Sequence, residues 1–273
     1  MLYLAFVSLC LLQPAPPVPP AASAPTGATQ PAAPQVNSAA VPAPRPDKWW
    51  QERNDSFNAR AKQGAEKGDI DIIFVGDSIT QGWEGEGKAV WKERFAPRNA
   101  VNFGIGGDRT QHVLYRVSTG NLDGLDSPAT GNSPRLVILM IGTNNTAGGP
   151  GVANSAQQIN QGIRADVRAI HDKLPRADIL VLGIFPRSEK PDAARELIVE
   201  TNKLVSNIGQ GIDGEPPMPR VRYLDISDKF LEKNGTISKE IMPDFLHLSE
   251  KGYRIWADAI AAEVDRSAPV RGK

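Results

Sequence analysis

Ser78 is the residue whose type and position first suggest chemistry in this sequence. It follows the apolar run 72–75 and the pair Gly76 and Asp77, so a hydroxyl stands where a buried strand is expected to end and a helix to begin. In an open α/β sheet, ligands bind at the carboxyl ends of the strands. A serine there could act as a nucleophile, with the N–H groups of the next helix offered to an anion. Gly, Asp and Ser also suit a plain turn with a helix cap, so this stretch alone leaves both interpretations open.

The chain has three histidines, which limits the candidates for a general base. Asp244 and His247 lie three residues apart in a turn that a proline begins. This spacing lets the carboxylate meet Nδ1 of the imidazole and leaves Nε2 facing outward. His171 falls in the C-terminal half of an expected helix, where a solvated histidine favoured by the helix dipole is the usual explanation. His112 stands near a helix start and is expected to make a structural hydrogen bond, so His247 is the candidate base.

Two further strand ends are expected to carry hydrogen-bond donors. The strand at 100–103 is followed by a glycine-rich stretch that includes Gly107, and the strand at 136–141 ends shortly before Asn144. The glycines do not form a dinucleotide-binding fingerprint, because Arg109 stands where its last glycine is required. They still allow the backbone to approach a ligand closely, so Gly107 can offer its N–H. Asn144 can offer its side-chain amide.

Together these groups make the parts of an ester-hydrolysis site. Ser78 would be the nucleophile, His247 the base and Asp244 the carboxylate that orients the base. Gly107 and Asn144 would donate to the oxyanion. No one motif is specific, and the prediction depends on their order and on their common sheet edge. Such chemistry requires no metal ion and no organic cofactor.

The elements that must position these residues alternate along the chain. Near-continuous apolar runs predict five strands, at 72–75, 100–103, 136–141, 178–184 and 221–226. Helices are predicted at about 47–67, 90–95, 152–173, 192–207 and 250–264. Trp49, Trp50 and Phe57 are expected to anchor the first helix on the core. Strands alternating with helices indicate an α/β fold with a parallel sheet covered on both faces.

Composition excludes several classes of protein. Of the 273 residues, 40% are hydrophobic, and 31 basic side chains balance 31 acidic ones. The sequence therefore lacks the basic excess of a nucleic-acid binder and the acidic excess of a solvating tail. The single cysteine, Cys10, lies in the N-terminal apolar stretch, so the domain is predicted to have no disulfide and no thiolate metal site.

The first 46 residues differ in composition from the rest of the chain. An apolar run too short to span a bilayer precedes Ala22-Ser23-Ala24, which resembles a cleavage site, so 1–24 is interpreted as a signal peptide. Residues 25–46 are rich in proline and alanine and are expected to form an extended linker. Residues 47–273 would form one domain. The mature protein is expected to have no integral membrane segment and to be secreted or to lie in the periplasm or cell envelope.

Four blocks of this sequence resemble the signature blocks of the SGNH, or GDSL, hydrolase family. They are 76–80 (GDSIT), 102–116 (NFGIGGDRTQHVLYR), 141–145 (IGTNN) and 244–249 (DFLHLS). Within the family they are most similar to the catalytic subunits of the intracellular kind of platelet-activating-factor acetylhydrolase. The resemblance covers about residues 70–264. It implies a three-layer α/β/α fold of the flavodoxin-like kind, with a five-stranded parallel sheet.

The resemblance also implies roles for individual residues. It assigns Ser78, Asp244 and His247 to a catalytic triad. The oxyanion hole would be formed by the backbone N–H groups of Ser78 and Gly107 and by the side-chain amide of Asn144. Because the family's acetylhydrolase subunits dimerise, a homodimer is suggested.

The acyl group that the resemblance implies is small. The positions that match the walls of the family's acyl pocket are Ile79, Thr143 and Leu246, and their branched side chains would favour acetyl over long acyl chains. The alternative is that these residues only pack beneath the triad. The substrate is therefore expected to be an acetyl ester, with either a carbohydrate or an acetylated phospholipid as the leaving group.

Two other functions stay open at this point. A lysophospholipase or thioesterase of the same superfamily would need a longer acyl groove. A non-catalytic module that binds carbohydrate or a partner could keep the fold, although binding alone has no need of a nucleophile, a base and an orienting acid together.

Overall fold

The computed structural model describes residues 36–147, 153–211 and 216–270 of the chain. Its contacts define a folded unit from Asn37 to Lys273. The expected signal peptide, 1–24, and the expected linker as far as residue 35 lie outside the described residues. Within the described ranges, no helix is both long enough and apolar enough to cross a membrane.

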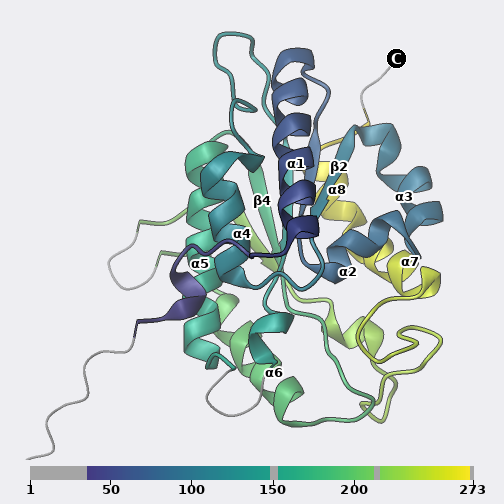
Figure 1. The fold of residues 1–273 in the computed structure, drawn as a ribbon. Helices are drawn as coiled ribbons and strands as arrows, with labels where there is room; N and C mark the ends of the chain where they lie inside the picture. The colour runs from purple at the N-terminus through teal and green to yellow at the C-terminus, as the bar shows by residue number, and fades with distance from the viewer. Residues whose placement is uncertain (1–35, 148–152, 212–215, 271–273) are drawn as a thin grey trace, which may run out of the picture. The chain divides into compact units, whose positions relative to one another are not determined.

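A parallel sheet of five strands forms the centre of this unit, in the order β2-β1-β3-β4-β5 (Figure 1). The strands are β1 (Ile72–Gly76), β2 (Ala100–Gly104), β3 (Leu136–Met140), β4 (Asp178–Leu182) and β5 (Val221–Leu224). Each lies on one of the apolar runs that predicted it. β1 and β3 are buried along their whole length, as continuous apolar runs predict for strands that pair on both sides.

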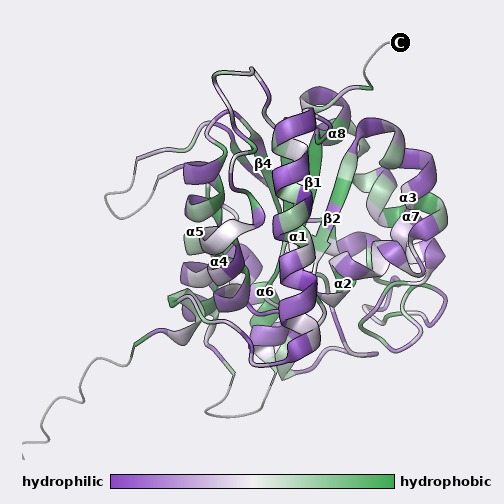
Figure 2. Cartoon of the chain, turned by 45° about the horizontal axis from the view of Figure 1, so that its top comes forward, coloured by the Kyte–Doolittle hydropathy of each residue, from purple (hydrophilic) through white to green (hydrophobic). Residues whose placement is uncertain are grey.

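Helices cover both faces of the sheet. One face packs against α1 (Lys48–Lys67), α4 (Thr110–Arg116), α5 (Ala156–Lys173) and α6 (Ala193–Val205). The other packs against α2 (Ser78–Gln81), α3 (Lys88–Arg94), α7 (Glu250–Ala259) and α8 (Ala261–Ser267). Hydrophobic residues gather on the strands and on the helix sides that face them, while the outer helix faces are largely hydrophilic (Figure 2). The predicted three-layer α/β/α fold is confirmed.

The register of the sheet brings the ends of three strands level. Gly76 of β1 pairs with Gly104 of β2 on one side and with Met140 of β3 on the other. The segments that leave these strands therefore begin side by side at the carboxyl edge. They carry three of the candidate residues: Ser78, Gly107 and Asn144.

Residues 37–46, here called the N-terminal strap, pack on the domain, whereas the sequence predicted an extended linker that ends at residue 46 (Figure 1). Ala39 is fully buried, and its carbonyl accepts a hydrogen bond of 2.7 Å from the Thr110 hydroxyl. Near the other end, Arg45 donates to the Gly106 carbonyl over 2.7 Å. The folded unit therefore begins earlier than predicted, because backbone and side-chain hydrogen bonds hold a segment that has little apolar surface.

Two helices also differ from their predictions. In α1, Trp50 and Phe57 are buried but Trp49 is 48% exposed, because neighbouring residues in a helix point about 100° apart. The predicted closing helix, 250–264, is interrupted at Ile260, where the backbone leaves helical geometry between α7 and α8.

An aromatic cluster fills the core beneath β1 on the face that α2, α3 and α7 cover. The fully buried ring of Phe74 lies at its centre. Its centroid is 4.8 Å from that of Phe95, 5.0 Å from Trp91 and 5.9 Å from Trp83, all at steep interplanar angles. Edge-to-face contacts of this kind add to the free energy gained by burial. The cluster therefore holds the strand that leads into Ser78.

A buried arginine joins two of the loops at the carboxyl edge. Arg116 is fully buried, and its Nη2 donates to the carbonyl of Gly76 over 3.0 Å. Its Nε donates to the Asp108 carboxylate over 2.9 Å, and its Nη1 donates to Asn121 over 3.0 Å. Asp108 also accepts from the Trp50 indole over 2.7 Å. One guanidinium thus connects the end of β1 with the glycine-rich loop after β2.

Asp77, the residue before the candidate nucleophile, is completely buried in this region. Its Oδ1 accepts the Ile79 N–H over 2.9 Å and so caps α2, while Oδ2 has no hydrogen-bond partner among the described residues. Burial raises the pKa of Asp77 to about 7, with the Asp108 carboxylate adding to the rise and Arg116 opposing it. A large share of Asp77 is therefore neutral in the folded protein near neutral pH.

Replacement of Phe74 by alanine tests the aromatic cluster. We expect Phe74→Ala to lower the free energy of unfolding by about 3 to 5 kcal/mol, because it leaves a cavity among rigid rings. Urea denaturation followed by tryptophan fluorescence measures this, and Val199→Ala, at a side chain that is 63% exposed, is the control with a change of about 0.5 kcal/mol or less. A loss below about 1 kcal/mol for Phe74→Ala would contradict a tightly packed cluster.

The raised pKa of Asp77 makes stability depend on pH. Between the unfolded pKa of 3.8 and the folded value of about 7, the native state keeps a proton that the unfolded chain has lost, so stability falls as the pH rises through this window. Asp77→Asn cannot ionise and keeps an oxygen that accepts from Ile79. We expect the stability of Asp77→Asn relative to wild type to increase by about 2 to 3 kcal/mol from pH 5 to pH 8. A constant difference in urea titrations at these two pH values would refute the neutral carboxyl.

Candidate active site

Ser78, His247 and Asp244 form a continuous chain of hydrogen bonds at the carboxyl edge of the sheet. His247 Nε2 lies 2.9 Å from Ser78 Oγ. On the other side of the ring, Nδ1 lies 2.7 Å from Asp244 Oδ2. Two loops that are 169 residues apart in sequence are thereby joined, and the contact between Asp244 and His247 is the one that their spacing predicted.

The loop that carries Asp244 and His247 is held by its own backbone. Asp244 Oδ1 accepts the N–H groups of Leu246 and His247, over 3.0 and 2.7 Å. Between them Phe245 has a φ of 61°, which is strained for a residue other than glycine, and its carbonyl accepts the Ser188 N–H over 2.8 Å. These hydrogen bonds hold the loop in this strained conformation, in which the carboxylate faces the imidazole.

The hydrogen bonds to Asp244 also set its ionisation. Partial burial would raise the pKa of this carboxyl, but the hydrogen bonds from the His247 ring and from the two backbone N–H groups outweigh burial and lower the pKa. The Asp244 side chain is 57% exposed and the His247 side chain 45%. Asp244 is therefore ionised across the neutral range and can orient the imidazole and stabilise its protonated form.

Ser78 is the first residue of the short helix α2, directly after the capping residue Asp77. Its side chain is half-buried, and its N–H has no acceptor among the described residues. The Tyr253 hydroxyl of α7 donates to the carbonyl of Ile79 over 2.7 Å and holds this turn from the far side. The serine is thus fixed with its hydroxyl toward His247 and its N–H unused.

The two other expected oxyanion donors lie in loops tied to the Ser78 turn and to each other. The Gly106 N–H donates to Oε1 of Gln81 in α2 over 2.7 Å. Asn144 Nδ2 donates to the carbonyl of Asp108 over 2.8 Å, which leaves its second amide hydrogen unused by described residues. Gly107 has a φ of 77°, and its N–H has no acceptor within the described ranges. Free N–H groups on Ser78, Gly107 and Asn144 thus belong to one connected set of loops.

The three residues expected to line an acyl pocket are not equally accessible. Ile79 is 1% exposed and belongs to the core on the α2 and α7 side of the sheet. Thr143 is fully buried, and its hydroxyl has no partner among the described residues. Leu246 is half-buried and packs against the same core as Ile79.

The other two histidines lie outside this hydrogen-bonded chain. His112 Nδ1 accepts the Arg109 N–H over 3.1 Å, the structural hydrogen bond that the sequence predicted. Burial, together with the charges of Arg45 and Arg109, lowers the pKa of His112 to about 4, so this ring is neutral at pH 7. His171 lies in the last turn of α5, where it is partly exposed.

Sequence reasoning missed several residues that support the site. Arg116 and Trp50 both donate to Asp108 in the glycine-rich loop that carries Gly107, here called the oxyanion loop after its expected role. Arg45 contacts this loop from the strap. Arg187, in the segment after β4, donates to the Thr143 carbonyl over 3.4 Å. The sequence gives one indication of the contact between Arg116 and Asp108. These two residues lie eight positions apart in the same sequence block as Gly107.

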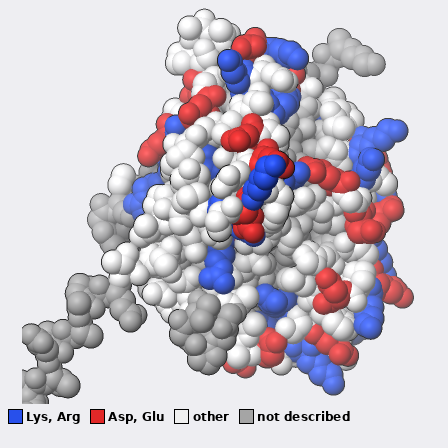
Figure 3. Space-filling model, in the orientation of Figure 1, with Lys and Arg blue, Asp and Glu red and all other residues white. Residues whose placement is uncertain are grey.

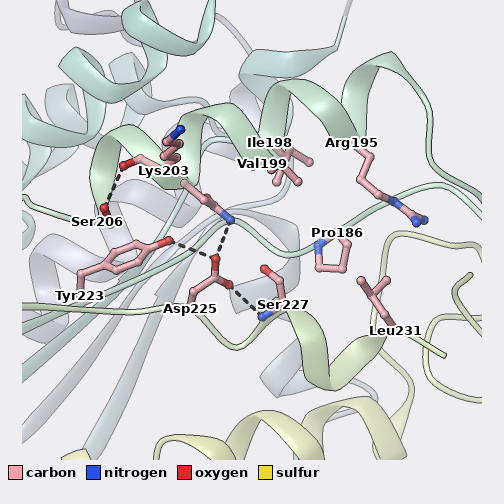
Figure 4. Close-up of a pocket in the computed structure, with 11 residues that line it drawn as sticks. Pro186, Arg195, Ile198, Val199, Lys203, Ser206, Tyr223, Asp225, Ser227 and Leu231 are labelled. Carbon is pink, nitrogen blue, oxygen red and sulfur yellow. Dashed lines mark hydrogen bonds between the residues drawn. The ribbon is translucent and has the colours of Figure 1, made fainter. Parts of the chain in front are cut away.

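The described residues offer no set of three or more His, Cys, Asp or Glu side chains placed to hold a metal ion. A separate cavity of about 320 Å³ lies between α6 and the segment that follows β5 (Figure 4). At its floor the Asp225 carboxylate accepts from the Tyr223 hydroxyl and the Ser227 N–H, so its polar groups are largely paired with one another. None of the triad or oxyanion residues lines it.

Charges of both signs are interspersed on the molecular face drawn in Figure 3. Several Arg side chains pair with Asp or Glu at the surface, as Arg53 does with Glu84 and Arg94 with Asp258. This face carries no continuous basic stripe of the kind that tracks a nucleic-acid backbone.

Known proteins match this chain over most of its folded unit. Residues 74–255 match the model of the GDSL-like Lipase/Acylhydrolase family. The chain is 35% identical over 219 residues to human platelet-activating factor acetylhydrolase IB subunit alpha1, covering 80% of this chain and 86% of the relative. It is 36% identical over 217 residues to the mouse subunit alpha2, with coverages of 80% and 86%.

Solved structures share the fold at lower identity. A member of the lipolytic G-D-S-L family from Veillonella parvula aligns with a TM-score of 0.55 and 19% identity, covering 72% of this chain and 99% of that one. An acetylxylan esterase from Geobacillus stearothermophilus aligns with a TM-score of 0.52 and 17% identity, covering 75% and 97%. The family match over most of the domain and the identity to the acetylhydrolase subunits show that this chain belongs to the GDSL-like lipase/acylhydrolase family of ester-hydrolysing enzymes.

Proposed function

We propose that this protein is a serine esterase that removes acetyl groups through Ser78, His247 and Asp244. The observation that carries the proposal is the hydrogen-bonded chain itself, 2.9 Å from Ser78 Oγ to His247 Nε2 and 2.7 Å from Nδ1 to Asp244. A nucleophile within hydrogen-bond reach of a base, which a carboxylate orients in turn, is the arrangement that acyl transfer requires.

In the first half of the reaction, Ser78 Oγ attacks the ester carbonyl carbon while His247 Nε2 takes the hydroxyl proton. The resulting imidazolium is stabilised by the ionised carboxylate of Asp244. Collapse of the tetrahedral intermediate breaks the bond to the leaving alcohol, which receives the proton from His247. In the second half, His247 takes a proton from water as the water attacks the acyl-enzyme. The bond from the acyl carbon to Ser78 Oγ then breaks, His247 returns the proton to Oγ, and acetate is released.

The negative charge that develops on the carbonyl oxygen needs donors that are already in place. The N–H groups of Ser78 and Gly107 and the second amide hydrogen of Asn144 are free to supply them. The loops that hold these groups are tied to one another by Gln81 and by the hydrogen bond from Asn144 to Asp108. Such fixed donors stabilise the transition state without reorganising during the reaction.

A small acyl group is proposed because the three residues expected at the acyl group offer little exposed surface to a long chain. Ile79 and Thr143 are buried in the core, and Leu246 is half-buried. Long acyl chains would have to displace these residues. The name of the relatives, acetylhydrolase, agrees with an acetyl preference.

The leaving group is proposed to be a carbohydrate hydroxyl or the glycerol hydroxyl of an acetylated phospholipid. The relatives named for platelet-activating factor support the second, and the N-terminal sequence, which favours a secreted or envelope location, supports the first. Acetate release from acetylated xylo-oligosaccharides and from a 2-acetyl ether phospholipid, compared at equal enzyme concentration, distinguishes the two.

Removal of the nucleophile tests the mechanism. We expect Ser78→Ala to lower kcat for p-nitrophenyl acetate by about 10,000-fold or more, because the acyl-enzyme can no longer form. Ser206→Ala, directly after α6 at the separate cavity, is the matched control and should keep wild-type activity. Hydrolysis by Ser78→Ala at the wild-type rate would refute the serine mechanism, and absence of turnover in the wild type would favour a binding module.

Acyl-chain selectivity tests the pocket. We expect the wild type to prefer p-nitrophenyl acetate over the butyrate, hexanoate and decanoate esters in kcat/KM. Leu246→Ala should raise the rate on butyrate relative to acetate by roughly tenfold, because it removes the half-buried side chain directly before His247. A wild-type preference for decanoate would instead support a lysophospholipase or thioesterase with a longer groove.

A further inference from the structure

The strap places a cationic side chain against the oxyanion loop. Arg45 Nη1 donates to the carbonyl oxygen of Gly106 over 2.7 Å, and Nε donates to Asp47 over 3.1 Å. The guanidinium lies 5.0 Å from the centre of the Trp49 ring, and the Arg45 side chain is only 19% exposed. Two hydrogen bonds and an aromatic ring therefore fix this side chain in one orientation.

The bond from Arg45 ends on the peptide group that carries the Gly107 N–H. The Gly106 carbonyl and the Gly107 N–H belong to the same planar unit, and no peptide bond in the described ranges is cis. In a trans peptide the C=O and the N–H point in opposite directions. Arg45 thus binds one end of this peptide, while the other end presents an N–H that no described residue accepts.

We infer that Arg45 is a positioning residue for ester hydrolysis, because it orients and polarises the Gly106–Gly107 peptide so that the Gly107 N–H donates more strongly to the oxyanion. The inference rests on the function proposed above. A charge-assisted hydrogen bond to a carbonyl draws electron density toward that oxygen and makes the N–H of the same amide a stronger donor. The hydrogen bond from the Gly107 N–H stabilises the substrate mainly when its carbonyl oxygen becomes negative, in the transition state.

The Gly106–Gly107 peptide needs a hydrogen bond from outside its loop to keep one orientation. Gly107 has a φ of 77° and is exposed, and glycine moves between backbone conformations more freely than any other residue. A Cβ built on Gly107 would lie 2.8 Å from Arg45 Nη1, so the guanidinium packs directly against this α-carbon. Without Arg45, the described residues would leave both ends of the peptide unbonded.

A second arginine, Arg53 of α1, bonds to a carbonyl at the start of the same loop and supplies a matched control. Arg53 Nε donates to the carbonyl of Gly104 over 2.8 Å, and its side chain is 20% exposed, close to the value for Arg45. The N–H of that peptide belongs to Ile105 and already donates to the Gly76 carbonyl. Arg53 therefore makes the same kind of bond to a peptide that cannot serve the oxyanion.

The experiment compares Arg45→Met, Arg45→Lys and Arg53→Met in the full-length chain with p-nitrophenyl acetate, with urea denaturation of each variant. We expect Arg45→Met to lower kcat about tenfold with KM within about twofold of wild type, since a weakened donor acts in the transition state. Arg45→Lys should recover most of this loss, because an ammonium can still donate to the Gly106 oxygen. Arg53→Met should keep kcat within about twofold of wild type.

Chemical rescue separates the charge from the packing of the strap. In Arg45→Ala, guanidinium chloride at a non-denaturing concentration should raise kcat, whereas sodium chloride at the same concentration should not. Wild-type kcat in Arg45→Met would overturn this inference alone, as would equal losses in Arg45→Met and Arg53→Met. A wild type without hydrolysis that depends on Ser78 would overturn the proposed function and the inference with it.

Discussion

The buried guanidinium of Arg116 is the contact on which the geometry of the carboxyl edge depends. It donates to the carbonyl of Gly76, two residues before the proposed nucleophile Ser78, and to Asp108, the residue after Gly107. A charge buried in this way is costly unless every partner is present, and removal of one partner typically destabilises a protein by about 3 to 5 kcal/mol. The fold therefore cannot separate the turn that carries Ser78 from the loop that carries Gly107 without a large loss of stability.

The aspartates around this edge occupy two kinds of environment. Asp77 and Asp166 are fully buried with unpartnered carboxylate oxygens, and burial raises both of their pKa values. Asp244 is exposed and fully hydrogen-bonded, so it remains ionised. The charge that the proposed mechanism requires thus lies where water can stabilise it when the imidazole is neutral. The buried carboxyls can avoid the cost of ionisation by keeping their protons.

The sequence predicted the parts of this structure that have a local signal. β1 and β3 lie on continuous apolar runs, because strands that are covered on both faces have no polar side. The edge strands β2 and β5 are only partly buried, and Asn102 and Arg222 interrupt their runs. The contact between Asp244 and His247 was predictable because three residues of a turn bring the two side chains together. The meeting of Ser78 with His247 followed only from the rule that loops of a parallel sheet gather at one edge.

The sequence could not predict contacts made by segments whose composition suggests that they do not fold onto the domain. The strap has the proline and alanine content of a linker, yet it is held by hydrogen bonds such as those of Ala39 and Arg45, which composition does not measure. Arg45 and Gly106 are 61 residues apart, and neither has a neighbour that marks the pair. The prediction that Trp49 anchors α1 on the core was wrong for a related reason. Its position in α1 turns the side chain away from the core and toward Arg45. The segment that composition assigns to a tether is therefore part of the folded domain, and through one arginine it reaches the peptide that carries the Gly107 N–H.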